Sequence, residues 1–172
     1  ETEKILLPWA TKNGKLYGIP KYSGGQIWGY WIRKDWLKKL GLSTPRTDEE
    51  LYKVAYAFTF NDPDGNGKKD TYGFSGGGGG QSFSMLENLS CMYGSPYMSV
   101  KGNTIDHPML NGVRKSFLTY LNRIIKAGLV DPNWYTQKWQ EGKSMWLMNK
   151  IGIVWYPPEL LFETLQANNY DE

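Results

Sequence analysis

A polar, glycine-punctuated segment over residues 62–70 carries the clearest chemistry in this sequence. Oxygen-bearing side chains occupy its positions 1, 3, 5 and 9, and a glycine occupies position 6; these residues are Asp62, Asp64, Asn66, Asp70 and Gly67. Alternate residues of a tightly turning loop point toward a common centre, and the glycine permits the turn that lets the Lys68 carbonyl face that centre. Because Ca²⁺ prefers oxygen ligands, this spacing predicts an EF-hand-type calcium loop.

The end of this loop departs from the EF-hand pattern. Position 12 is Gly73, where an EF-hand has a bidentate glutamate. We therefore expect the ligand shell to be completed by Thr71, by water or by a distant carboxylate such as Glu87. Two other interpretations stay open. One is a polar turn between a helix and a strand. The other is the Asp-x-Asp motif of a metal-dependent glycosyltransferase, although no nucleotide-binding segment accompanies it.

Aromatic residues form the second chemical signal, with 8 Trp and 12 Tyr in the chain. Residues at strand ends and in the adjoining loops often line ligand crevices in α/β folds, and aromatic faces suit the apolar C–H faces of sugars. Polar neighbours are needed for the sugar hydroxyls. On this basis the predicted ligand-binding residues are Tyr22, Gln26, Trp28, Trp155 and Tyr156. Core packing is an equally open explanation for each of the aromatic residues.

The composition argues against several other kinds of site. One histidine, His107, and one cysteine, Cys91, leave little room for a zinc site, a disulfide framework or histidine-based catalysis. The 20 basic and 17 acidic residues are interspersed and leave a net charge of +3, which gives no strong field for nucleic acid. No apolar run approaches the roughly 20 residues that span a bilayer. We expect Cys91 to be buried.

A run of five glycines over residues 76–80 could suggest a phosphate-binding loop. It lacks the Lys-Ser/Thr pair of a P-loop, and Gln81 interrupts the dinucleotide-binding pattern. We therefore expect a flexible connection or a backbone that lies close to a ligand.

Helices and short strands alternate along the chain and must position these residues. Thr47 and Glu50 form a capping box, which predicts the start of an amphipathic helix that ends near residue 60. Strands are expected at residues 16–19, 30–33, 72–74 and 151–155, and a hairpin at residues 97–105. Other helices are expected at residues 34–40, 83–93, 108–127, 139–149 and 157–167. The pattern predicts a helix-rich α/β domain with a small sheet.

Several segments together resemble the bacterial extracellular solute-binding proteins of ABC importers. They follow the order of that family over nearly the whole chain; they are residues 14–20 (GKLYGIP), 32–42 (IRKDWLKKLGL), 45–51, 126–132 and 149–153. Residues 62–73 are similar to the calcium loop of the alginate-binding and lipoprotein-type members. Thr71 departs from that loop, because the alginate-binding relatives have an acidic ligand there.

The resemblance implies one lobe of a two-lobed periplasmic-binding-protein-like fold. Residues 1–172 are then expected to form a single lobe, a fragment of a longer receptor, with Ca²⁺ in the loop over residues 62–73. The implied function is non-catalytic capture of an extracellular carbohydrate, expected to be an oligosaccharide. The implied partners are the missing second lobe and the permease subunits of the importer. The implied location is extracellular, as a membrane-anchored lipoprotein, or periplasmic.

A calcium-stabilised domain of a secreted carbohydrate-active enzyme is the alternative function. Such an enzyme needs two carboxylates about 5–10 Å apart. The candidates in this sequence are Glu141, Glu159 and Glu163.

Overall fold

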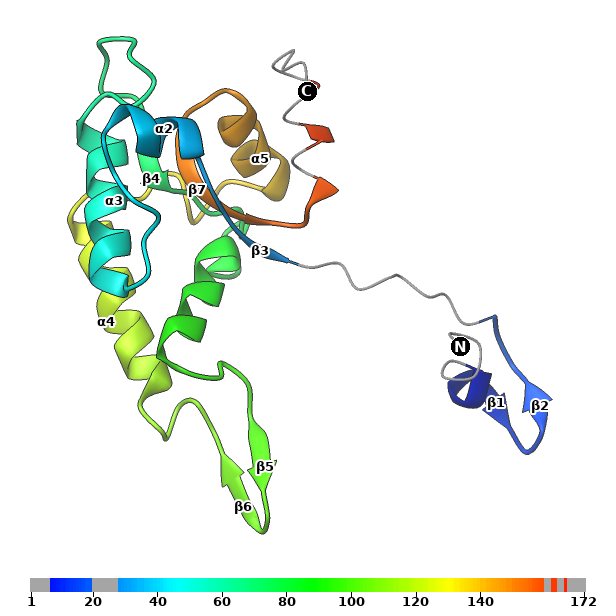
Figure 1. The fold of residues 1–172 in the computed structure, drawn as a ribbon. Coiled ribbons are helices and arrows are strands. Elements are labelled where there is room, and N and C mark those ends of the chain that lie inside the picture. Colours follow the sequence, from blue (N-terminus) through cyan, green and yellow to red (C-terminus); the bar gives the residue numbers. More distant parts are fainter. Residues whose placement is uncertain (1–6, 20–27, 160–161, 164–165, 167–172) are drawn as a thin grey trace.

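The computed structural model describes residues 7–19, 28–159, 162–163 and 166. A three-stranded sheet lies at its centre in the order β3–β7–β4. The strands are β3 (Gly29–Ile32), β7 (Ile151–Tyr156) and β4 (Tyr72–Phe74). β7 pairs antiparallel with β3 and parallel with β4. The chain is therefore a helix-rich α/β fold with a small central sheet, as predicted (Figure 1).

Helices pack on both faces of this sheet (Figure 1). They are α2 (Lys34–Lys39), α3 (Asp48–Phe60), the 3₁₀ helix η1 (Ser84–Tyr93), α4 (Val113–Lys126) and α5 (Trp139–Leu147). One core packs side chains of α3, α4 and η1, among them Phe58 and Phe117, against Ile153 of β7. A second core packs Trp146 of α5 against Val154 of β7. The neighbouring residues Ile153 and Val154 of β7 thus pack into different cores.

The cap predicted at Thr47 forms at the start of α3, but the return hydrogen bond of the predicted capping box goes to Arg46 and not to Thr47. The Thr47 Oγ1 accepts a hydrogen bond from the Glu50 backbone N–H at 3.1 Å, and the Glu50 carboxylate accepts one from the Arg46 N–H at 2.7 Å. Val54 and Phe58 lie one turn apart on the face that is buried. Thr47 and the apolar spacing behind it therefore fix both the start of this helix and the face that it buries.

The helix expected from Pro108 begins later, at Val113, so that boundary was wrong. Gly112 has a left-handed φ of 88°, which interrupts helical geometry. The preceding residues form a turn instead, and Leu110 is 86% exposed. The other end is confirmed: Gly128 is left-handed, and the Leu129 N–H donates to the Ile124 carbonyl at 3.0 Å.

Two hairpins lie outside the central sheet. The expected hairpin is confirmed as β5 (Ser99–Lys101) paired with β6 (Thr104–Asp106). Near the N-terminus, β1 (Thr11–Lys12) pairs with β2 (Lys15–Leu16), so the strand expected at residues 16–19 was wrong. Asn13 and Gly14 both have positive φ, which is typical of a tight two-residue hairpin turn and leaves Leu16 as the last paired residue.

Two tryptophans on the helices are buried, whereas the cysteine is exposed. Trp36 and Trp146 are buried, whereas Trp139 is half-buried. Cys91 is exposed, so its predicted burial was wrong. η1 has the three-residue repeat of a 3₁₀ helix, which buries Leu86 and Leu89 and leaves Cys91 outside.

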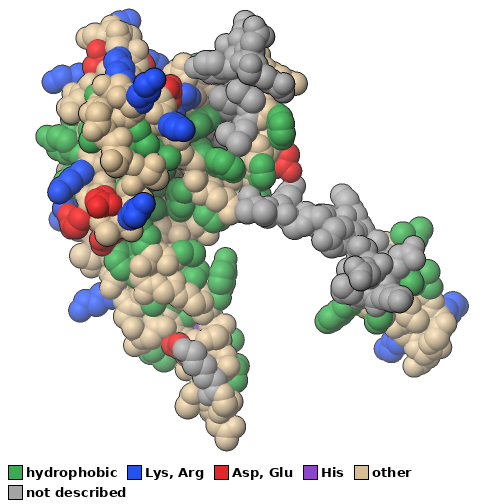
Figure 2. All heavy atoms as spheres, in the orientation of Figure 1, with side chains coloured by type: hydrophobic (Ala, Val, Ile, Leu, Met, Phe, Trp, Pro, Cys, Tyr) green, Lys and Arg blue, Asp and Glu red, His purple; other side chains and the backbone are tan. Residues whose placement is uncertain are grey.

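Charged side chains of both signs gather over the end of the body that carries α2 and α3 (Figure 2). This interspersed surface agrees with the modest net charge of the chain. In the part of the chain that the structure describes, no helix is both long and apolar enough to cross a membrane. Most of the helix expected at residues 157–167 lies outside the described residues.

Candidate binding edge and calcium loop

One end of the central sheet gathers three of the strand termini. β4 and β7 run parallel, so the segments that follow them leave the sheet at the same end. β3 runs antiparallel, with Gly29 opposite Tyr156, so Trp28 lies at this end as well. We term this end the carboxyl edge, marked by Trp28, Ser75 and Tyr156. Ligands of open α/β sheets bind in the crevice beyond the carboxyl ends of the strands.

Three aromatic rings pack against one another at tilted angles at the carboxyl edge. The Trp28 and Trp139 ring centroids lie 5.6 Å apart, and those of Trp139 and Tyr156 lie 4.2 Å apart. Tyr156 is only 2% exposed, and its hydroxyl donates to the Trp139 carbonyl at 3.0 Å, whereas Trp28 is 40% exposed. Burial therefore raises the pKa of the Tyr156 hydroxyl. Tyr156 supports this aromatic cluster from inside, and Trp28 presents its ring to solvent.

Trp155, the neighbour of Tyr156 on β7, points to the other face of the sheet from this aromatic cluster. Its ring packs edge-on against Tyr30, its cross-strand partner, at 4.9 Å between centroids. The two side chains, with Leu89, Met92 and other apolar groups, line a hollow of about 430 Å³. The structure thus brings Trp28 and Tyr156 together and separates them from Trp155. The other two predicted ligand-binding residues, Tyr22 and Gln26, lie outside the described residues.

The glycine run over residues 76–80 lies at the carboxyl edge and is held in place. A Cβ atom at Gly76 would overlap the Trp134 carbonyl oxygen, so only glycine fits there. The N–H groups of Gly79 and Gly80 donate to backbone carbonyls of the segment between α4 and α5, at 3.0 and 2.7 Å. The expected flexible connection was therefore wrong, because close packing and hydrogen bonds to a distant part of the chain hold this glycine segment.

A buried polar network anchors the glycine segment. Asp131 is 1% exposed, and its carboxylate accepts hydrogen bonds from the Ser75 hydroxyl at 3.0 Å and the Gln137 side-chain amide at 2.8 Å. The same amide donates to the Gly76 carbonyl at 2.9 Å, and the Asn133 N–H donates to Asp131 at 3.0 Å. Buried polar groups satisfied in this way hold a fixed geometry. Sequence reasoning missed this network, whose signal is the Asp131 that follows a buried apolar pair.

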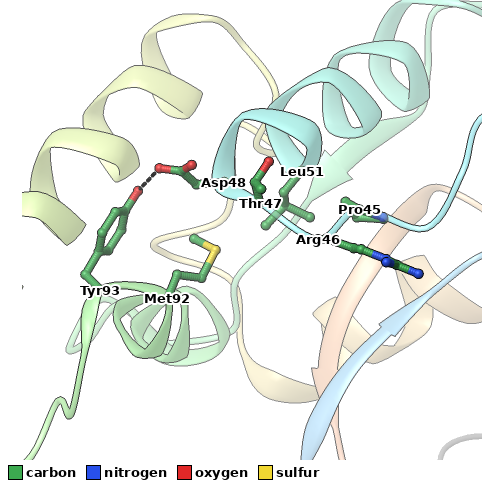
Figure 3. Close-up of a pocket in the computed structure, with 7 residues that line it drawn as sticks. All are labelled: Pro45, Arg46, Thr47, Asp48, Leu51, Met92 and Tyr93. Carbon is green, nitrogen blue, oxygen red and sulfur yellow. Dashed lines mark hydrogen bonds between the residues drawn. The ribbon is translucent and has the colours of Figure 1, made fainter.

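A second hollow adjoins the one at Trp155 and has a volume of about 510 Å³ (Figure 3). It is lined by Pro45, Arg46, Thr47, Asp48, Leu51, Met92 and Tyr93, which come from the start of α3 and the end of η1. Across it the Tyr93 hydroxyl donates to the Asp48 carboxylate at 2.9 Å (Figure 3). Burial and this carboxylate both raise the pKa of Tyr93. Sequence reasoning assigned no role here, since the capping box indicated only a helix start.

The predicted calcium loop lies between α3 and β4 and is ordered by its own side chains. The Asp62 carboxylate accepts hydrogen bonds from three backbone N–H groups, those of Gly65, Asn66 and Gly67, at 3.0–3.1 Å. The Asn66 side-chain amide donates to Asp64 at 2.7 Å and to Asp70 at 3.1 Å. The predicted oxygen-bearing side chains are therefore brought together on one side of the loop.

Lys150 reaches this loop from the start of β7. Its Nζ lies 2.6 Å from an oxygen of Asp70 and 3.6 Å from an oxygen of Asp64. The hydrogen bond from Lys150 lowers the pKa of Asp70, and Asp70 in turn raises the pKa of Lys150. Within the described residues, no group of three His, Cys, Asp or Glu side chains is arranged to hold a metal ion. The ammonium and the Asn66 amide lie among the carboxylates instead.

The donor set nevertheless fits Ca²⁺ in chemical type. Three carboxylates and an amide side chain are gathered on one short loop, with Lys68 following Gly67, whose φ of 74° is left-handed. Thr71 lies apart from this group: it is 2% exposed, and its hydroxyl donates to the Phe58 carbonyl at 2.8 Å. Its side chain ties the loop to the end of α3, and the ligand set of the loop stays a prediction.

The chain matches known proteins over most of its length. The family model of the bacterial extracellular solute-binding protein matches residues 1–166. The polygalacturonan/rhamnogalacturonan-binding protein YtcQ of Bacillus subtilis is 50% identical over 72 residues, which is 42% of this chain and 14% of YtcQ. The fructooligosaccharide ABC transporter substrate-binding protein FusA of Streptococcus pneumoniae is 35% identical over 127 residues, which is 72% of this chain and 24% of FusA.

A solved structure agrees with these matches. The FusA EF-hand mutant of S. pneumoniae in complex with fructo-nystose superposes with a TM-score of 0.63 and 29% identity, over 76% of this chain and 27% of that one. The chain therefore spans less than a third of the length of these relatives.

Proposed function

The chain belongs to the family of bacterial extracellular solute-binding proteins, and on that premise we propose that it is part of a receptor that captures an oligosaccharide. The receptor delivers its solute to the permease subunits of an ABC importer. It works outside the cell, as a membrane-anchored lipoprotein or in the periplasm. Two relatives support a carbohydrate ligand, since YtcQ is named for polygalacturonan and rhamnogalacturonan and FusA for fructooligosaccharide.

The carboxyl edge is the observation that carries this proposal. An exposed Trp28 ring lies on a buried aromatic support, beside a glycine segment that the Asp131–Gln137 network holds in place. An aromatic face can pack on the apolar side of a sugar ring, and backbone groups without side chains can approach its hydroxyls closely. In a two-lobed receptor, a second lobe would close the other side of the crevice.

Ca²⁺ in the loop over residues 62–73 has a structural role in this proposal. The loop joins α3 to β4, so a cation among Asp62, Asp64, Asn66 and Asp70 would connect the two elements without contacting the solute. The EF-hand named for the FusA structure supports a calcium loop in this type of receptor. Calcium that binds only the folded state stabilises it by mass action.

The protein captures its solute without catalysis. The carboxylates considered for an enzyme have structural partners: Glu141 accepts a hydrogen bond from the Lys138 N–H at the start of α5, and Glu163 forms an ion pair with Lys143. Neither presents the pair of free carboxylates that glycoside hydrolysis requires. Pure protein is therefore expected to leave polysaccharides and glycosides unchanged in a reducing-sugar assay.

Calorimetric titration tests the proposal. The complete receptor and this chain alone are titrated with fructo-oligosaccharides and with oligogalacturonides. We expect the complete receptor to bind one class far more tightly, because each lobe supplies only part of the contacts while the loss of association entropy is similar. Equal affinity of chain and receptor would refute a crevice shared between two lobes, and no binding of any oligosaccharide by the receptor would refute the carbohydrate ligand.

A further inference from the structure

Lys150 links the central sheet to the calcium loop, through its backbone on one side and its side chain on the other. Its backbone carbonyl accepts a hydrogen bond from the Tyr72 N–H at 2.9 Å, which fixes it beside the first residue of β4. Its side chain is 28% exposed and reaches back to Asp64 and Asp70, 86 and 80 positions earlier in the chain. Lys150 thus places a positive charge among carboxylates that would otherwise repel one another.

The residue after Asp70 brings no charge that would strengthen calcium binding. Thr71 stands directly after Asp70, and its hydroxyl is hydrogen-bonded to the Phe58 carbonyl in the core. Calcium loops tune their affinity through the number of charged ligands. This loop therefore combines three carboxylates with one lysine ammonium, rather than with a further acidic ligand.

We propose that Lys150 is an internal cation of the loop, which holds Asp64 and Asp70 together without metal and competes with Ca²⁺ for them. The inference rests on the calcium loop of the proposed function. Lys150 must leave the carboxylates before a dication binds there, because the two positive charges repel at contact distance. The loop is consequently ordered in the metal-free protein, and its calcium affinity is lower than the carboxylates alone would give.

The experiment compares Lys150→Met with the wild-type chain in calcium titrations and in thermal melts with a chelator. Methionine keeps much of the side-chain length and removes the charge. We expect the variant to bind Ca²⁺ about tenfold more tightly, because Ca²⁺ no longer has to displace the ammonium from Asp64 and Asp70. In chelator we expect it to melt several degrees below the wild type, because its carboxylates lose their internal cation.

Lys39→Met is the matched control. Lys39 donates to the Asp62 backbone carbonyl at 3.3 Å, so it places a lysine at the same loop with no contact to Asp64 or Asp70. Lys39→Met is expected to change both quantities little, and Lys150→Arg, which keeps the charge, to retain weak calcium binding. Lys150→Gln provides a second neutral variant if the methionine variant does not fold.

The outcomes separate this inference from the calcium loop itself. Tighter calcium binding and a lower melting temperature in chelator, both specific to the neutral Lys150 variants, support the internal cation. Wild-type values in the neutral variants, or changes equal to those of Lys39→Met, overturn it. If neither wild type nor variants bind Ca²⁺, the calcium loop is refuted, and the melts in chelator alone decide whether Lys150 acts as the internal cation.

Discussion

Replacing Gln137 with alanine tests how the glycine segment is held at the carboxyl edge. The Gln137 side chain is 7% exposed, and its amide donates to the Asp131 carboxylate at 2.8 Å and to the Gly76 carbonyl at 2.9 Å. It also contacts the Ser75 hydroxyl. Alanine removes these donors and leaves a buried carboxylate and a buried carbonyl with fewer partners.

The expected loss follows from the types of these hydrogen bonds. A hydrogen bond to a charged group contributes about 1.5–3 kcal/mol, and one between neutral groups contributes about 1 kcal/mol. We therefore expect Gln137→Ala to lower the free energy of unfolding by about 3 kcal/mol. For a domain of this size, the loss corresponds to a decrease of about 6–12 °C in melting temperature.

Chemical denaturation and calorimetry measure this loss, with Gln140→Ala as the control. Gln140 is an exposed glutamine three positions along the chain, and we expect its replacement to change stability by less than about 0.5 kcal/mol. Hydrogen exchange should become faster at the Gly79 and Gly80 amides in Gln137→Ala alone. A loss below about 1 kcal/mol, or unchanged exchange at these glycines, would show that the network does not hold the segment.

Three further predictions concern the core and the calcium loop. Arg33→Met should lower the free energy of unfolding by about 2–4 kcal/mol in denaturation experiments, because the buried guanidinium donates to the Ile151 and Trp146 carbonyls and lies over the Trp146 ring. A loss no larger than that of an exposed lysine variant would contradict this. Calcium at a hundred times its Kd should stabilise the wild type by about 2.7 kcal/mol and so raise its melting temperature, and Asp64→Ala should abolish this rise. Identical wild-type melts in calcium and in chelator would refute the site. The lowered pKa of Asp70 predicts a stabilisation of the fold that is complete above the ordinary pKa near 4 and is lost as pH falls through the lowered pKa. Acid unfolding followed by circular dichroism measures this loss, and Asp70→Asn should remove it.

Local sequence signals predicted the parts of this fold that depend on neighbouring residues. The Thr47 cap, the β5–β6 hairpin and the helix end at Gly128 each depend on a few hydrogen bonds within their own segment. The oxygen-bearing side chains of the loop after α3 are likewise gathered by contacts that span at most five residues. Such features could be predicted because their geometry depends mainly on local backbone preferences.

The parts that could not be predicted depend on contacts between distant segments. The glycine segment is ordered by Asp131 and Gln137, which lie 56 and 61 residues from the groups that they hold. Lys150 meets Asp70 across 80 residues. The separation of Trp155 from Tyr156 depends on which distant ring each one meets, Tyr30 for Trp155 and Trp139 for Tyr156. Composition and periodicity do not predict which residues far apart in the sequence come into contact.

Binding of an oligosaccharide at the carboxyl edge is the central claim, and a titration of Trp28→Ala tests it most directly. The variant is made in the complete receptor and titrated calorimetrically with the oligosaccharide class that the wild type binds. Tyr56→Ala is the control, since Tyr56 is a 48% exposed aromatic residue on α3. Loss of an aromatic contact in a desolvated interface typically costs about 2 kcal/mol or more. We therefore predict at least about a thirtyfold weaker affinity for Trp28→Ala and wild-type affinity for Tyr56→Ala, whereas unchanged affinity in Trp28→Ala would contradict the account.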